Sequence, residues 1–122
     1  MKFYQLFVSL IVVGLIFSCK SKDPSVLKIY VRSNNHILTP DATVRIVGDI
    51  SEGTPEYFEE KKTDESGVVI FNLDELFSTY EKEQNAVAHF TLYAKDTSAY
   101  YTTKEVRAKI HLTSVETIIL DD

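Results

Sequence analysis

The residue with the most distinctive chemistry is Cys19, the only cysteine of the chain. It follows an apolar run, Phe3–Phe17, that begins directly behind the charge of Lys2. A positive start, an apolar stretch and a small residue at the cut are typical of a secretory signal, and Ser18 supplies the small residue. A lone thiol has no partner for a disulfide within the chain. The position of Cys19 therefore indicates a processing site, at which residues 1–18 are removed.

The same apolar run has an alternative interpretation as a membrane anchor that is never cut. A helix that spans a bilayer needs about 20 apolar residues. This run is shorter, and it contains Ser9 and Gly14. We therefore predict an N-terminal signal helix over residues 1–18, a short tether over 19–25 and one domain over 26–122.

The other candidates for chemistry are three histidines and a stretch rich in carboxylates. Zinc sites need several ligands that converge, often at short spacing. His36, His89 and His111 lack such spacing, so we predict solvated histidines and no metal site. The carboxylates of residues 56–65 are interleaved with lysines, which favours a solvated strand edge over an acid–base pair. A calcium ion in the loop of residues 48–55 is the alternative left open.

Motifs of common enzyme classes are missing from the sequence. It contains no Gly-x-Ser-x-Gly elbow and no phosphate-binding glycine loop. Its 13 basic and 18 acidic residues give a net charge of −5. An acidic domain is poorly suited to bind nucleic acid or anionic lipid by electrostatics. We expect a protein that is not an enzyme, has no cofactor and does not bind nucleic acid.

Three tyrosines, Tyr93, Tyr100 and Tyr101, cluster near the end of one predicted strand. Exposed aromatic residues are enriched at interfaces. These tyrosines are therefore the candidate binding surface. The alternative is that they pack in the core and in loops, where aromatic rings also bury much area.

Apolar and polar residues alternate along most of the domain, which is the pattern of half-buried strands. Seven such segments are predicted, over residues 26–32, 42–47, 57–63, 68–71, 86–95, 102–112 and 115–120. Between the fourth and fifth segments the apolar spacing changes to three and four, which predicts one short helix near residues 73–83. Asp64 and Gly67 predict a tight turn before the fourth strand, because aspartate bonds to the backbone downstream and glycine accepts positive φ.

The residues Ile16-Phe17-Ser18-Cys19 resemble the lipobox of bacterial lipoproteins. The resemblance implies that lipid chains, such as palmitate, are attached through Cys19. Two or more chains hold a protein stably at a membrane. Lys20 in place of an aspartate implies the outer membrane by the common sorting pattern. The segment Lys20–Asp23 is similar to the export tag of surface lipoproteins in Bacteroidetes-type bacteria, so the domain is expected to face the periplasm or the cell surface.

Two segments resemble strands of transthyretin-like and carboxypeptidase-regulatory-like domains. Residues 40–46 are similar to an early strand of that family, and residues 63–71 to its threonine–aspartate–x–x–glycine turn and the strand that follows. The resemblance implies a mainly β fold, a seven-stranded antiparallel sandwich of the Ig-like or prealbumin-like kind. It implies no catalytic residues, because such domains usually serve as structural or binding modules.

Together these expectations describe a membrane-anchored lipoprotein of the cell envelope. Its β-sandwich is expected to act as a binding or accessory module, with the membrane contacted through Cys19 and an unknown protein or glycan as partner. The alternative is a carrier that holds a small hydrophobic or sugar ligand between its sheets or at a dimer interface.

Overall fold

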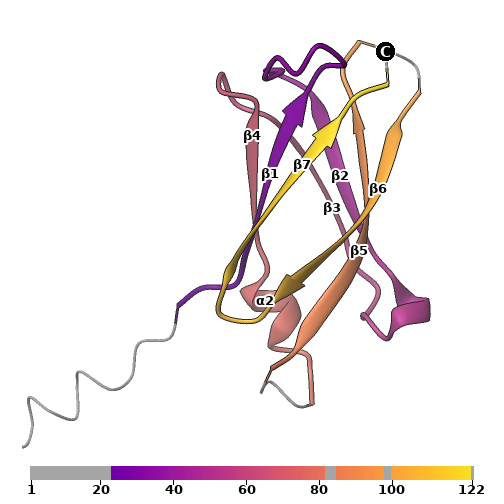
Figure 1. Ribbon diagram of the computed structural model, residues 1–122. Coiled ribbons are helices and arrows are strands. Elements are labelled where there is room, and N and C mark those ends of the chain that lie inside the picture. The colour runs from indigo at the N-terminus through magenta and orange to yellow at the C-terminus, as the bar shows by residue number, and fades with distance from the viewer. Residues whose placement is uncertain (1–22, 82–84, 98–99, 122) are drawn as a thin grey trace, which may run out of the picture.

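The computed structural model describes residues 23–81, 85–97 and 100–121. Within them, seven strands and two short helices form a two-layered sandwich (Figure 1). The strands are β1 (Val26–Arg32), β2 (Thr43–Gly48), β3 (Phe58–Lys62), β4 (Val68–Asn72), β5 (Val87–Lys95), β6 (Thr102–Lys109) and β7 (Thr113–Ile119). The helices are the 3-10 turn η1 (Ile50–Glu52) and α2 (Asp74–Phe77). No helix in this part of the chain is long and apolar enough to cross a membrane, and the predicted signal helix and Cys19 lie outside the described residues.

The two layers are a small sheet in the order β4-β1-β7 and a large sheet in the order β3-β2-β5-β6. The prediction of a mainly β, seven-stranded, sandwich-like fold is confirmed. The prediction that every pair is antiparallel is wrong, because β1 and β7 are parallel. The chain crosses from β6 to β7 at the end of the sandwich where β1 begins, so β7 must run in the same direction as β1 (Figure 1).

The core lies between the sheets and is built from every second residue of the strands. In β1 the inward side chains of Leu27, Ile29 and Val31 are fully buried, and β5 buries four residues in the same way. Strands place alternate side chains on opposite faces, so each strand contributes one apolar row. The largest rings that fill the interior are those of Phe71, Phe77 and Phe90.

The helix α2 is shorter than the sequence predicted. It covers four residues, Asp74–Phe77, whereas the apolar spacing predicted a helix near residues 73–83. The hydroxyls of Ser78 and Thr79 donate hydrogen bonds to the carbonyls of the helix itself, at 2.6 and 2.7 Å. Such side-chain bonds compete with the backbone bonds of a continuing helix. The same apolar residues are therefore buried by a single turn followed by an irregular segment.

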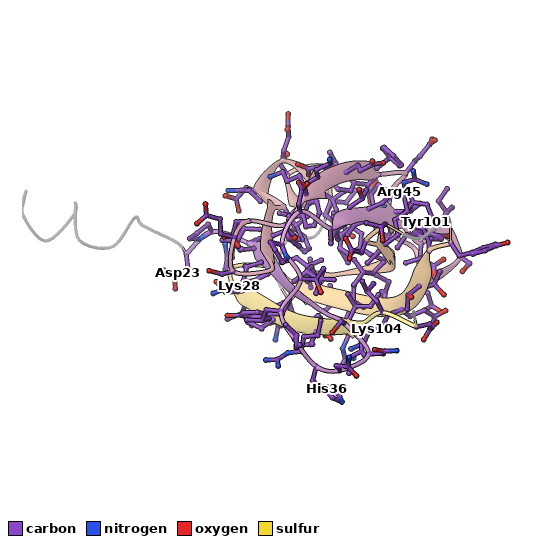
Figure 2. All side chains as sticks on the ribbon, turned by 90° about the horizontal axis from the view of Figure 1, so that it is seen from above. Asp23, Lys28, His36, Arg45, Tyr101 and Lys104 are labelled. Carbon is purple, nitrogen blue, oxygen red and sulfur yellow. The ribbon has the colours of Figure 1, made fainter. Side chains whose placement is uncertain are left out.

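Two lysines close the open sides of the sandwich. On one side the Lys61 ammonium of β3 donates to the carbonyl of Ile70 in β4 at 3.0 Å. On the other side the Lys104 ammonium of β6 donates to the carbonyl of Thr117 in β7 at 2.8 Å (Figure 2). Each ammonium also lies 3.4 Å from a carboxylate, that of Glu59 and that of Glu116 respectively. Inward-pointing charges at sheet edges prevent pairing with other chains.

Ser25 fixes the chain where it enters the domain. Its backbone N–H donates to the Asp74 carboxylate at 2.7 Å, and its carbonyl accepts from the Leu73 N–H at 2.8 Å. Its hydroxyl accepts from the backbone N–H of His111 at 2.8 Å. Ser25 is 1% exposed. These bonds tie the start of β1 to α2 and to the turn before β7.

The turn between β3 and β4 is built on Asp64 and Gly67. The Asp64 carboxylate accepts from the N–H groups of Ser66 and Val68 at 2.8 and 3.1 Å. Gly67 has φ of +72°, and a Cβ added there would lie 2.8 Å from the backbone nitrogen of Thr39. Both the conformation and the close approach of the backbone therefore require glycine at this position.

We predict that Gly67→Ala lowers the free energy of unfolding more than Gly53→Ala does. Gly53 also has positive φ, at +85°, but a Cβ there meets nothing within 4 Å. The control should cost about 1 kcal/mol from the left-handed backbone alone, and Gly67→Ala about 2 kcal/mol or more because the clash adds to it. Urea titration followed by circular dichroism measures both values. Equal losses would show that the contact with Thr39 does not constrain the turn.

Candidate functional site: an aromatic and cationic surface

Two of the three candidate tyrosines come together on the outer face of the large sheet. Tyr93 lies on β5 and Tyr101 directly precedes β6. Their ring centroids are 6.1 Å apart and the rings meet edge to face at 89°. This geometry is favoured by the charge distribution of aromatic rings. Tyr100, the neighbour in sequence, is 84% exposed.

Arg45 of β2 is the centre of this surface, and sequence reasoning did not identify it. Its guanidinium donates to the hydroxyl of Tyr101 at 3.2 Å and to the carboxylate of Glu60 at 3.1 Å. The guanidinium carbon also lies 4.9 Å from the ring centroid of Tyr101 and 5.4 Å from that of Phe58. Arginine positions of this kind combine a salt bridge with cation–π contacts. Figure 2 shows Arg45 and Tyr101 on the same side of the sandwich.

A second cation, Lys95, lies against the same ring. Its ammonium is 4.7 Å from the ring centroid of Tyr101. We call the set of Arg45, Phe58, Tyr93, Lys95 and Tyr101 the aromatic surface. Its residues come from β2, β3, β5 and the segment before β6. The aromatic surface therefore exists only once the large sheet has formed.

Strand register explains why the sequence hid Arg45. In the folded sheet Arg45 lies opposite Glu60 of β3 on one side and opposite Tyr93 of β5 on the other. These residues are far apart in sequence. Alternation shows that each of them points outward, but it does not say which strands are neighbours. The signal available was a charged residue at an outward position of a predicted strand.

The aromatic surface suits binding by contact. Tyrosine and arginine are the residues that most often dominate binding at protein interfaces. Phe58 is 61% exposed and Tyr100 lies beside the surface, so apolar area remains open to a partner. Arg45 and Lys95 provide donors for carboxylate, phosphate or hydroxyl groups.

The three histidines lie apart from one another in the fold. His36 is exposed in the loop after β1, His89 is half-buried on β5, and His111 lies in the turn before β7 with its ring 2.9 Å from the carbonyl of Asp23. Among the described residues no three His, Cys, Asp or Glu side chains gather closely enough to hold a metal. In the loop where calcium was the open alternative, the Asp49 carboxylate accepts from the N–H and the hydroxyl of Ser51.

Tyr57 is a titratable residue whose pKa departs strongly from its ordinary value. Its ring packs on Phe90 at a centroid distance of 6.0 Å, and its hydroxyl donates to the Glu59 carboxylate. Burial, followed by the hydrogen bond to Glu59, raises the pKa of Tyr57. A phenol with a raised pKa stays protonated in the folded chain, so its contribution to stability decreases only above pH 10, where the unfolded residue ionises.

Comparison with known proteins assigns no family to this chain. No family model matches the chain, and no curated protein matches it. A solved structure that matches is that of catechol 1,2-dioxygenase from Acinetobacter sp. ADP1, inhibited by bound mercury. The TM-score is 0.45 and the identity 12%, and the match covers 72% of this chain but 37% of the dioxygenase chain.

This comparison corrects one prediction from the sequence. The absence of catalytic motifs predicted a protein that is not an enzyme, whereas a solved structure that matches is that of an enzyme. The prediction is therefore withdrawn. At this identity and TM-score, the likeness assigns no activity, substrate or cofactor to this chain.

Proposed function

We propose that this chain is a lipoprotein of the bacterial envelope, of the Bacteroidetes type. In this proposal it is held at the outer membrane by lipid on Cys19, and its prealbumin-like sandwich is a binding or accessory module that faces the periplasm or the cell surface. The lipobox-like residues before Cys19 support the anchor. Seven strands in two sheets support the prealbumin-like architecture.

The placement of the aromatic surface is the observation that carries the proposal. The segment that would hold the lipid leads into β1, which is the central strand of the small sheet. The aromatic surface lies on the outer face of the large sheet, on the opposite side of the sandwich. Figure 2 shows this separation, with Lys28 of β1 and Arg45 of β2 on different sides. A partner, protein or glycan, therefore has access to Arg45 and Tyr101 while the chain is anchored.

The carrier alternative has weaker support. A ligand between the sheets would occupy the space of Phe71, Phe77 and Phe90, each of which is at most 2% exposed. Interiors packed in this way leave few voids larger than a water molecule. The binding module therefore fits the geometry better than a carrier that holds its ligand between the sheets.

The anchor is tested by feeding radiolabelled palmitate to cells that express the full chain. We predict label on the wild type and none on Cys19→Ala, because only the Cys19 thiol can receive the lipid. Ser18→Ala keeps a small residue before the cut and serves as the matched control, which should label as the wild type does. Equally poor labelling of the wild type and Cys19→Ala would contradict the anchor.

The binding role is tested by photo-crosslinking from the aromatic surface. A benzophenone amino acid in place of Tyr100 reacts with C–H bonds of either a protein or a glycan. We predict discrete products of higher mass from this position in intact cells. The matched position is Ile50, which is 67% exposed at the opposite end of the sandwich. The same products from both positions would contradict a partner at the aromatic surface.

A further inference from the structure

Seven carboxylates of the described residues gather at one end of the sandwich. This is the end where the chain enters at Ser25, and it consists of the segments 23–25, 49–57, 73–81, 85–86 and 110–112. Their acidic residues are Asp23, Asp49, Glu52, Glu56, Asp74, Glu75 and Glu81. The described residues of these segments include no lysine and no arginine. We call this region the acidic end.

The outer face of the small sheet has the opposite character. Its outward residues on β4, β1 and β7 are Val26, Lys28, Tyr30, Arg32, Val68, Ile70, Asn72, Thr113, Val115, Thr117 and Ile119. This small-sheet face carries two cations and no carboxylate, in a chain with 18 acidic and 13 basic residues. Ile70, Val115 and Ile119 are 52%, 56% and 42% exposed. Apolar side chains and cations without a carboxylate neighbour on the same face therefore share one open surface.

The outer face of the large sheet differs in its charges. It carries carboxylates, those of Glu60 and Glu105, among its cations. The guanidinium of Arg45 is already paired with Glu60 at 3.1 Å. The small-sheet face is the one that combines exposed aliphatic residues with cations and lacks acidic groups.

We propose that the small-sheet face rests on an anionic lipid surface, so that the anchored sandwich lies on its side with the aromatic surface turned outward. This inference rests on the proposed lipid anchor. Amphipathic surfaces with aliphatic residues and Lys or Arg bind at the interface of anionic membranes. The acidic end is repelled by the same membrane within a Debye length of about 10 Å. A sandwich that stood on the acidic end would bring these carboxylates against the lipid. A sandwich that lies on the small-sheet face keeps them at its side.

The tether makes this contact accessible. A chain spans at most about 3.5 Å per residue, so the four residue steps from Cys19 to Asp23 can reach at most roughly 14 Å. A tether of this length keeps the start of β1 near the lipid and raises the effective concentration of the face at the membrane. Even a weak contact between the small-sheet face and the lipid is then formed in a large fraction of the anchored molecules. A second copy is a poorer occupant, because a two-fold contact would bring Lys28 and Arg32 of both copies together.

The absence of tryptophan from the chain allows a direct test. Val115→Trp places a single fluorophore on the small-sheet face, and Phe58→Trp places one on the large sheet at a similar exposure, 56% against 61% for the native residues. The full lipidated chain is reconstituted into vesicles of phosphatidylcholine with phosphatidylglycerol, and the quenching of each tryptophan by brominated lipid is measured. Ile70→Trp repeats the measurement on the far strand of the face if Val115→Trp does not fold.

We expect quenching of Val115→Trp that weakens with added salt and in phosphatidylcholine alone, and little quenching of Phe58→Trp. Adding Lys28→Glu to Val115→Trp should reduce the face-bound population about fivefold or more, whereas Lys109→Glu on the large sheet should leave it unchanged. Equal quenching of the two tryptophans, or none of either, overturns the inference. Flotation of the same samples separates the two proposals: vesicles that float without the protein contradict the anchor, and protein that floats without quenching of Val115→Trp contradicts only the orientation.

Discussion

Burial of β1 between β4 and β7 is the constraint on which the rest of the structure depends. Its inward side chains, Leu27, Ile29 and Val31, are fully buried. Apolar burial stabilises a fold by about 25 cal/mol for each Å² removed from water, and a chain with one cysteine has no internal disulfide to add to it. Because β1 is central, both outer strands of the small sheet take their position from it. Ser25 fixes its start, so the direction in which the chain leaves the domain is also set.

The edges and the two outer faces of the sandwich carry different side chains and have different roles. Lys61 and Lys104 close the two open sides, each by a bond to a backbone carbonyl of the opposite sheet. The large sheet gathers Arg45 and its aromatic neighbours, while the small sheet exposes aliphatic residues and cations. The carboxylates lie mostly in the connections between strands. Net charge alone predicted no attraction to anionic lipid, but the fold separates the charges, and a surface within a Debye length responds to the nearest of them.

The sequence was sufficient for the strands and insufficient for their arrangement. Alternation predicted β1, β2 and β5 well, because each buries one face and period two is a local signal. The apolar spacing predicted a helix longer than α2, because spacing alone does not show that the hydroxyls of Ser78 and Thr79 bond to carbonyls of the helix. The last part of the predicted segment 102–112 is a turn, where His111 has φ of +61° and Leu112 is 51% exposed. The parallel pairing of β1 with β7 and the position of Arg45 depend on strand order, which no local pattern contains.

The central role of β1 is tested most directly by native-state hydrogen exchange of the full chain. Amides that open only on global unfolding exchange slowest, whereas edge strands exchange through local opening. We predict that amides of residues 27–31 are among the slowest and are matched by those of β5. The edge strand β3, whose side chains are mostly exposed, should exchange faster. Exchange of β1 at the rate of β3 would contradict a sandwich organised around β1.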